Sequence, residues 1–175
     1  MGTSRRTFLK AGGLAALLLG AGGAIYRATH ADPRHPAQRF ALDGEARAAL
    51  HAIAPAILAG ALPQGSGREA ALSATIDGVH GAILGLPPAT QQEVQDLFGL
   101  LALAPARRLL TGVSGGWEKA DAGQVGAFLQ DWRLHRLGLL RSAYHALHDL
   151  VLGAWYAQPA SWPATGYPGP MKELS

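Results

Sequence analysis

Cysteine is absent from all 175 residues of this chain. Disulfides, iron–sulfur clusters and thioether-linked haem all require cysteine, so the sequence excludes them. After residue 24, no segment approaches the roughly 20 consecutive apolar residues of a membrane-spanning helix. We therefore expect a domain without covalent redox chemistry and with no cofactor of its own.

The positive charge of the chain is concentrated near its start. The sequence has 15 basic and 12 acidic side chains. Four of the basic ones, Arg5, Arg6, Lys10 and Arg27, precede residue 32, and none of the acidic ones does. Residues 32–175 therefore carry 11 basic and 12 acidic side chains. They lack the basic surplus that nucleic-acid binding requires, so we expect no nucleic-acid partner.

Residues 4–10, SRRTFLK, match a twin-arginine export signal. The signal residues are Ser4, Arg5, Arg6, Phe8, Leu9 and Lys10. The apolar run that follows, residues 11–24, is diluted by glycine and too short to span a bilayer. We expect residues 1–31 to be a signal peptide for export to the periplasm, with Asp32 as the first mature residue. An uncleaved signal anchor is the alternative.

Apolar residues recur three and four positions apart through most of residues 43–158. Proline- and glycine-containing stops at residues 62–65 and 86–88 divide this pattern, and sustained period-two alternation is missing. The pattern predicts a single all-α domain of four or five helices over 43–158. Residues 32–42, which hold two prolines, are predicted to be an extended tether.

Local patterns predict how individual helices begin and bend. Pro55 predicts a kink or a division into two short helices. Thr90 and Glu93 have the spacing of a capping box. Residues 106–112 are predicted to be a short turn before a glycine-rich connector, residues 112–120. From Asp121 to residue 155 the apolar stripe is the longest of the chain, with a bend expected near residues 136–138.

The C-terminal tail, residues 159–175, combines aromatic residues with prolines. Its proline density predicts that it is not helical, and Pro168-Gly169 suits the centre of a type II turn. Two interpretations stay open. Either Trp155 and Trp162 fold back and close the core, or the tail lies on a partner protein with the turn as a rigid hook.

Two other patterns resemble catalytic or metal sites. Residues 112–116, GVSGG, match the hydrolase pattern around Ser114. That motif needs a strand before the serine and a helix after it, so we expect a connector instead. His145 and His148 could share one helix face with His135 further back, and a metal would need a ligand from another helix. This gives the alternative function, a free-standing periplasmic helical protein that binds a metal or small ligand.

Five arginines lie near the aromatic stripe or the connector. We expect them to form a solvated helix face or, alternatively, a surface that docks a partner. They are Arg107, Arg108, Arg133, Arg136 and Arg141.

The leader, the Trp155-Tyr156 pair, Trp162 and the terminal series Gly166 to Pro170 together resemble a known family. It is the small-subunit family typified by gluconate 2-dehydrogenase subunit 3. The resemblance covers residues 4–10 and roughly 117–170, and between them only the helical pattern agrees.

That resemblance implies a non-catalytic accessory subunit of an exported dehydrogenase. The small subunit supplies the signal and assists maturation and co-export of a large catalytic subunit, which carries FAD. A cytochrome c subunit and the twin-arginine translocase are the other implied partners, and the complex would lie at the periplasmic side of the inner membrane. No catalytic residue is implied here. We expect the large subunit to bind the tail at Trp155, Tyr156, Trp162, Tyr167, Pro168, Gly169 and Pro170.

Overall fold

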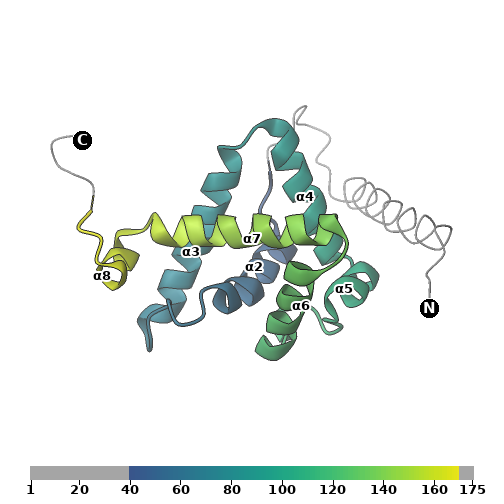
Figure 1. Cartoon of the computed structure of the whole chain (residues 1–175), viewed down its shortest axis with the longest axis horizontal. Coiled ribbons are helices and arrows are strands. Elements are labelled where there is room, and N and C mark those ends of the chain that lie inside the picture. Colours follow the sequence, from purple (N-terminus) through teal and green to yellow (C-terminus); the bar gives the residue numbers. More distant parts are fainter. Residues whose placement is uncertain (1–39, 170–175) are drawn as a thin grey trace.

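A computed structural model of the chain describes residues 40–169. The predicted signal residues and Pro170 lie outside this range. The described residues are helical and include no strand, which confirms the all-α prediction (Figure 1). The helices are α2 (Gly44–Ile57), α3 (Gly67–Leu84), α4 (Pro88–Ala102), α5 (Ala104–Thr111), α6 (Ala122–Leu134), α7 (Gly138–Tyr156) and α8 (Trp162–Thr165), with 3₁₀-helices η1 (Trp117–Lys119) and η2 (Pro159–Ser161).

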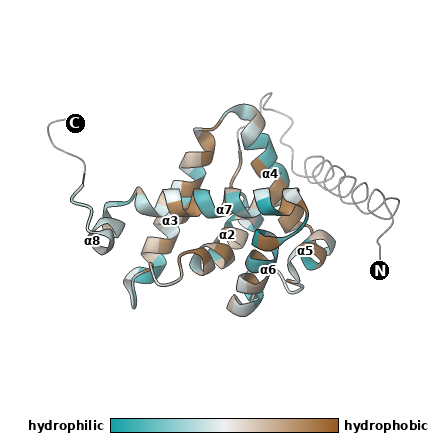
Figure 2. Cartoon of the chain, viewed as in Figure 1, coloured by the Kyte–Doolittle hydropathy of each residue, from teal (hydrophilic) through white to brown (hydrophobic). Residues whose placement is uncertain are grey.

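Helix α2 forms the centre of the core. It packs on α3, α4, α6, α7 and η1, and Leu50 and Ile53 on it are fully buried. Helices α3 and α7 cross closely, because Gly78 has no side chain there. A Cβ added to Gly78 would lie 3.2 Å from the Cβ of Ala154. The longer helices carry apolar and hydrophilic residues along the same element, as expected for helices that cover a shared core (Figure 2).

The helix starts have identifiable causes. The Asp43 carboxylate accepts a hydrogen bond from the Ala46 N–H at 2.8 Å at the start of α2. Asp121 and Gln124 form a capping box at the start of α6. The capping box predicted at Thr90 is wrong, because α4 already begins at Pro88. Proline needs no N–H in the first helical turn, so it starts a helix well.

Two expectations based on proline were wrong, a turn at residues 106–112 and a division of the helix at Pro55; the alternative of a kink at Pro55 stays a prediction. The predicted short turn at residues 106–112 is mostly α5, a helix that has Pro105 in its first turn and ends at Gly112 with a φ of +74°. Helix α2 continues through Pro55 instead of dividing. It ends only two residues later, so few backbone hydrogen bonds depend on that position, and Ala54 and Leu58 beside it are buried.

The bend expected near residues 136–138 is a complete break between α6 and α7. His135 lies at this corner, and its Nδ1 accepts a hydrogen bond from the Leu137 N–H at 3.1 Å. Arg141 donates from Nη1 to the His135 carbonyl at 2.7 Å. The domain thus has six helices of eight or more residues in the described range, against the four or five predicted, because this segment divides and α5 is helical.

Residues 32–39 of the predicted tether lie outside the described residues, whereas residues 40–42 belong to no helix but pack onto the domain. Phe40 is buried, and its N–H donates to Oε1 of Gln91 at 3.1 Å. The Gln91 Nε2 donates to the carbonyls of Leu84 and Leu86, at 3.1 and 2.8 Å. One buried amide therefore joins the segment before α2 to the turn between α3 and α4.

Candidate functional site

Two carbonyl groups at the end of α4 accept hydrogen bonds from side chains outside that helix. The Leu101 carbonyl would ordinarily accept from the N–H four residues later, but residue 105 is proline and has none. Trp117 donates to this oxygen from its indole Nε1 at 2.9 Å. Arg107 donates from Nη1 to the neighbouring carbonyl of Ala102 at 3.1 Å. Side chains from α5 and η1 thus donate the hydrogen bonds that the last carbonyl groups of α4 lack within their own helix.

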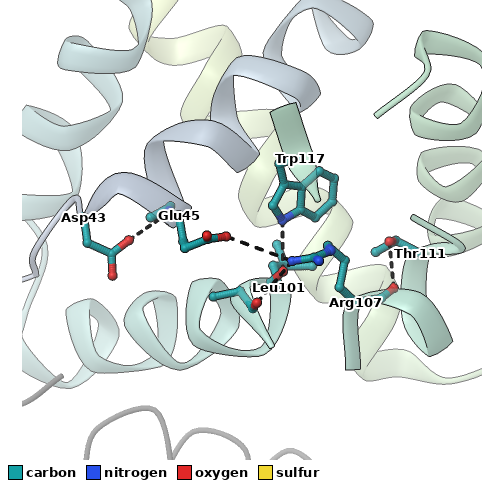
Figure 3. A network of polar contacts seen from close by, with 8 residues as sticks. Asp43, Glu45, Leu101, Arg107, Thr111 and Trp117 are labelled. Carbon is teal, nitrogen blue, oxygen red and sulfur yellow. Dashed lines mark hydrogen bonds and ion pairs between the residues drawn. The ribbon is translucent and has the colours of Figure 1, made fainter. Parts of the chain in front are cut away.

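Arg107 is buried, with 6% of its surface exposed. The expectation of a solvated or partner-docking arginine is therefore wrong at this position. Its nearest carboxylate is that of Glu45, whose Oε2 lies 4.0 Å from Nη1 (Figure 3). The buried Nε has no hydrogen-bond partner among the described residues. A buried charge is costly unless it is paired, so this guanidinium retains capacity for an acceptor.

A cavity of about 450 Å³ lies beside Arg107. Its walls come from three separate segments: the first turns of α2, the helix α5, and the connector with η1. They are Asp43, Gly44, Glu45, Ala48, Arg107, Gly115, Gly116, Trp117 and Glu118. We call this the Arg107 cavity. Its volume lies in the range of small-molecule sites.

The first turn of α2 contributes hydrogen-bond donors to the Arg107 cavity. The N-cap Asp43 satisfies the Ala46 N–H, but the N–H groups of Gly44 and Glu45 have no partner within the part of the chain that the structure describes. Such free N–H groups at a helix start attract anions, and the helix dipole adds to the effect. Arg107 and the two residues that carry these amides therefore line the same cavity.

Sequence reasoning missed Arg107, Trp117 and Glu45 as a group. Part of the signal was present, because Pro105 stands four residues after Leu101 and must leave its carbonyl unpaired. The rest depends on contacts between segments far apart in the chain, as between Glu45 and Arg107. The glycine-rich connector, expected to serve only as a link, carries the buried Trp117.

Capping by tryptophan recurs in this fold. Trp132 donates from Nε1 to the carbonyl of Leu110, in the last turn of α5, at 2.9 Å. Trp162 donates in the same way to the carbonyl of Tyr156, the last residue of α7, at 3.1 Å. Three of the four tryptophans thus satisfy carbonyls at helix C-termini.

The predicted partner-binding residues of the tail occupy different environments. Trp155 is 3% exposed and belongs to the core, as the first interpretation expected. Tyr156 and Tyr167 are 47% and 49% exposed. Trp162 is half-buried and meets the Tyr167 ring edge-on, with centroids 5.3 Å apart.

The tail is also partly helical, contrary to prediction, because Pro159 and Pro163 occupy first-turn positions of η2 and α8. Gly169 has the positive φ expected for the proposed turn, +95°. It packs against the Trp162 ring, so that an added Cβ would lie 3.0 Å from it. Helix α8 packs chiefly on η2 and stands apart from the helical domain (Figure 1).

The candidate metal ligands do not converge. His148 pairs through Nδ1 with the Asp149 carboxylate at 3.0 Å, and the Tyr144 ring contacts both His145 and His148. His135 lies at the start of the break between α6 and α7. Among residues 40–169, no three side chains of metal-binding type form a group that could hold an ion. The metal-binding alternative therefore gains no support here.

Ser114 is exposed in the connector and follows helix α5 rather than a strand, so the nucleophile elbow is not formed. Arg133, Arg136 and Arg141 are exposed around the break between α6 and α7. Leu134 at this corner is 74% exposed. These three arginines are thus exposed, as a solvated or a partner-docking surface requires, whereas Arg107 is buried.

No family model, curated protein or solved structure matches this chain. The resemblance described above therefore rests on the residues quoted for it. No helix of the described residues combines the length and the apolar character that crossing a membrane requires.

Proposed function

We propose that this chain is the non-catalytic small accessory subunit of an exported FAD-dependent dehydrogenase. In this role it supplies the twin-arginine signal of residues 4–10 and assists the maturation and co-export of the large subunit. The expected site of action is the periplasmic side of the inner membrane, within the complex. FAD belongs to the large subunit, and a cytochrome c subunit completes the complex.

The observation that carries the proposal is the C-terminal hook, which we define as residues 159–169. It is held at its base, where Gln158 donates from Nε2 to the Thr75 hydroxyl at 3.0 Å and Ser161 is buried. Beyond that base, Trp162, Tyr167 and Gly169 pack on one another. Aromatic residues ordered in this way away from the core offer anchors of the kind that protein interfaces favour.

The hook narrows the set of expected contact residues. Tyr156, Trp162 and Tyr167 have surface available to a partner, and Trp155 does not. Trp155 then supports the interface indirectly, by fixing the end of α7. The large subunit is proposed to cover the exposed faces of the two tyrosines.

The proposal is tested by affinity purification of the full chain from the organism that encodes it. We expect a large protein with the absorption spectrum of bound flavin to co-purify. Tyr156→Ala and Tyr167→Ala should each weaken the complex by about 2 kcal/mol, as expected for interface anchors. Leu109→Ala is the matched control, because Leu109 is 72% exposed but lies on α5.

Export gives a second test of the same proposal. Arg5→Lys combined with Arg6→Lys should retain both this chain and the flavoprotein in the cytoplasm. The proposal fails if no flavoprotein co-purifies and dehydrogenase activity still reaches the periplasm in a strain that lacks this gene.

A further inference from the structure

One side of the Arg107 cavity is suited to a single negative charge. The free N–H groups of Gly44 and Glu45 open the helix α2, whose dipole favours an anion at this end. Arg107 lines the cavity with a guanidinium that is nine-tenths buried and whose nearest carboxylate, that of Glu45, lies 4.0 Å away. A ligand carboxylate would give the two amides an acceptor and the guanidinium a second counter-charge beside that of Glu45.

The rest of the cavity is suited to a positive charge. The carboxylates of Asp43, Glu45 and Glu118 line it, so that three acids face one arginine. This surplus disfavours a dianion such as phosphate and attracts an ammonium group. The Glu45 side chain is 58% exposed and holds Arg107 only at 4.0 Å, so its carboxylate can turn towards a ligand with little loss.

We propose that the Arg107 cavity binds a small zwitterion of the α-amino acid type. The ligand carboxylate lies at the Gly44 and Glu45 amides and Arg107. The ligand ammonium group lies at the Glu45 and Glu118 carboxylates. Ala48 and the Trp117 ring provide apolar wall for a side chain, and about 450 Å³ accommodates one such molecule. This site is independent of the dehydrogenase partner proposed above.

Binding is measured on the full chain with ¹⁵N-labelled tryptophan, by following the indole N–H signals on titration with L-alanine, L-leucine and L-phenylalanine. At least one should shift the Trp117 signal, with a dissociation constant of about 1 mM or tighter for a ligand of this size. The Trp155 indole, in the core away from the cavity, should not move. Two analogues of phenylalanine, 3-phenylpropanoate and 2-phenylethylamine, each lack one charge and should bind about tenfold more weakly or worse.

Exposed acids give variants that leave the buried core intact. Glu45→Gln combined with Glu118→Gln should weaken binding of the amino acid about tenfold. The same double variant should bind 3-phenylpropanoate more tightly, because it removes repulsion of the carboxylate. Glu93→Gln, an exposed acid of α4 outside the cavity, is the control and should change neither affinity. Arg107→Lys should abolish binding, with circular dichroism verifying the fold.

The proposal is overturned if none of the three amino acids shifts the Trp117 signal at about ten times the expected dissociation constant. It is equally overturned if 3-phenylpropanoate and phenylalanine bind with the same affinity and the double variant Glu45→Gln, Glu118→Gln changes neither affinity. In those cases Arg107 serves only to close the end of α4.

Discussion

Tryptophan capping of helix ends makes a quantitative prediction at Trp117. Replacing Trp117 by Phe keeps an aromatic ring but removes the only donor to the Leu101 carbonyl among the described residues, since Pro105 follows four residues later and has no N–H. A buried carbonyl left without a partner costs about 1–3 kcal/mol. The smaller ring loses a further ~1 kcal/mol or more of apolar burial, since Trp117 is 3% exposed. The expected loss of unfolding free energy is about 2–4 kcal/mol.

Trp162→Phe is the matched control for this prediction. Its indole also donates to a helix-end carbonyl, that of Tyr156, but this bond is exposed and water can replace it. The expected loss is about 1 kcal/mol or less. The unfolding free energy of both variants is measured by urea denaturation, with circular dichroism as the signal. A difference of about 2 kcal/mol between them corresponds to a shift of about 1 M urea in the midpoint. Equal stabilities of the two variants would refute the argument that burial decides the strength of an indole cap.

Three further substitutions test other parts of the domain. Gln91→Ala should lower the unfolding free energy by about 3 kcal/mol, because it leaves buried backbone groups unpaired, and should speed hydrogen exchange at the Phe40 amide; unchanged exchange there would contradict it. Asp121→Ala should cost about 1 kcal/mol in urea denaturation by removing the capping box, and Asp121→Asn should cost less. Gly112→Ala should lower the melting temperature, with a cost of about 1 kcal/mol, since φ there is +74°; a neutral result would show that α5 can end differently.

The helical part of the fold was predictable where periodicity alone decides it. Leu72, Ile76, Val79 and Ile83 recur three and four positions apart in the sequence, and all four are buried on α3. The spacing of 3.6 residues per turn fixes which side chains share a face, whatever the helix packs on. The cap at Asp43 was predictable for a similar local reason.

The helix boundaries were less predictable, because one residue type can have opposite effects at neighbouring positions. Proline disfavours a helix interior, although α2 continues through Pro55 near its end, whereas proline in the first turn favours a helix start, as at Pro88 and Pro105. Pro163 shows the same effect in the tail. Residue type alone was therefore insufficient, and the position relative to the previous helix end decided the outcome.

The candidate site was not predictable from local pattern. Burial of Arg107 depends on α2, α4 and η1 coming together around it, and Gln91 depends on a segment 51 residues earlier. Charged and amide side chains carry no periodic signal of burial, because they are usually exposed. Only the unpaired carbonyl before Pro105 was available from the sequence.

The bond between Phe40 and Gln91 determines how much of the chain can be removed. Its partners show that the folded unit includes Phe40, three residues before the cap of α2, since Phe40 is 4% exposed and contacts Phe98. A recombinant fragment designed to start at Asp43 would lose an aromatic plug and leave one buried amide unsatisfied, whereas one starting a few residues before Phe40 would keep both.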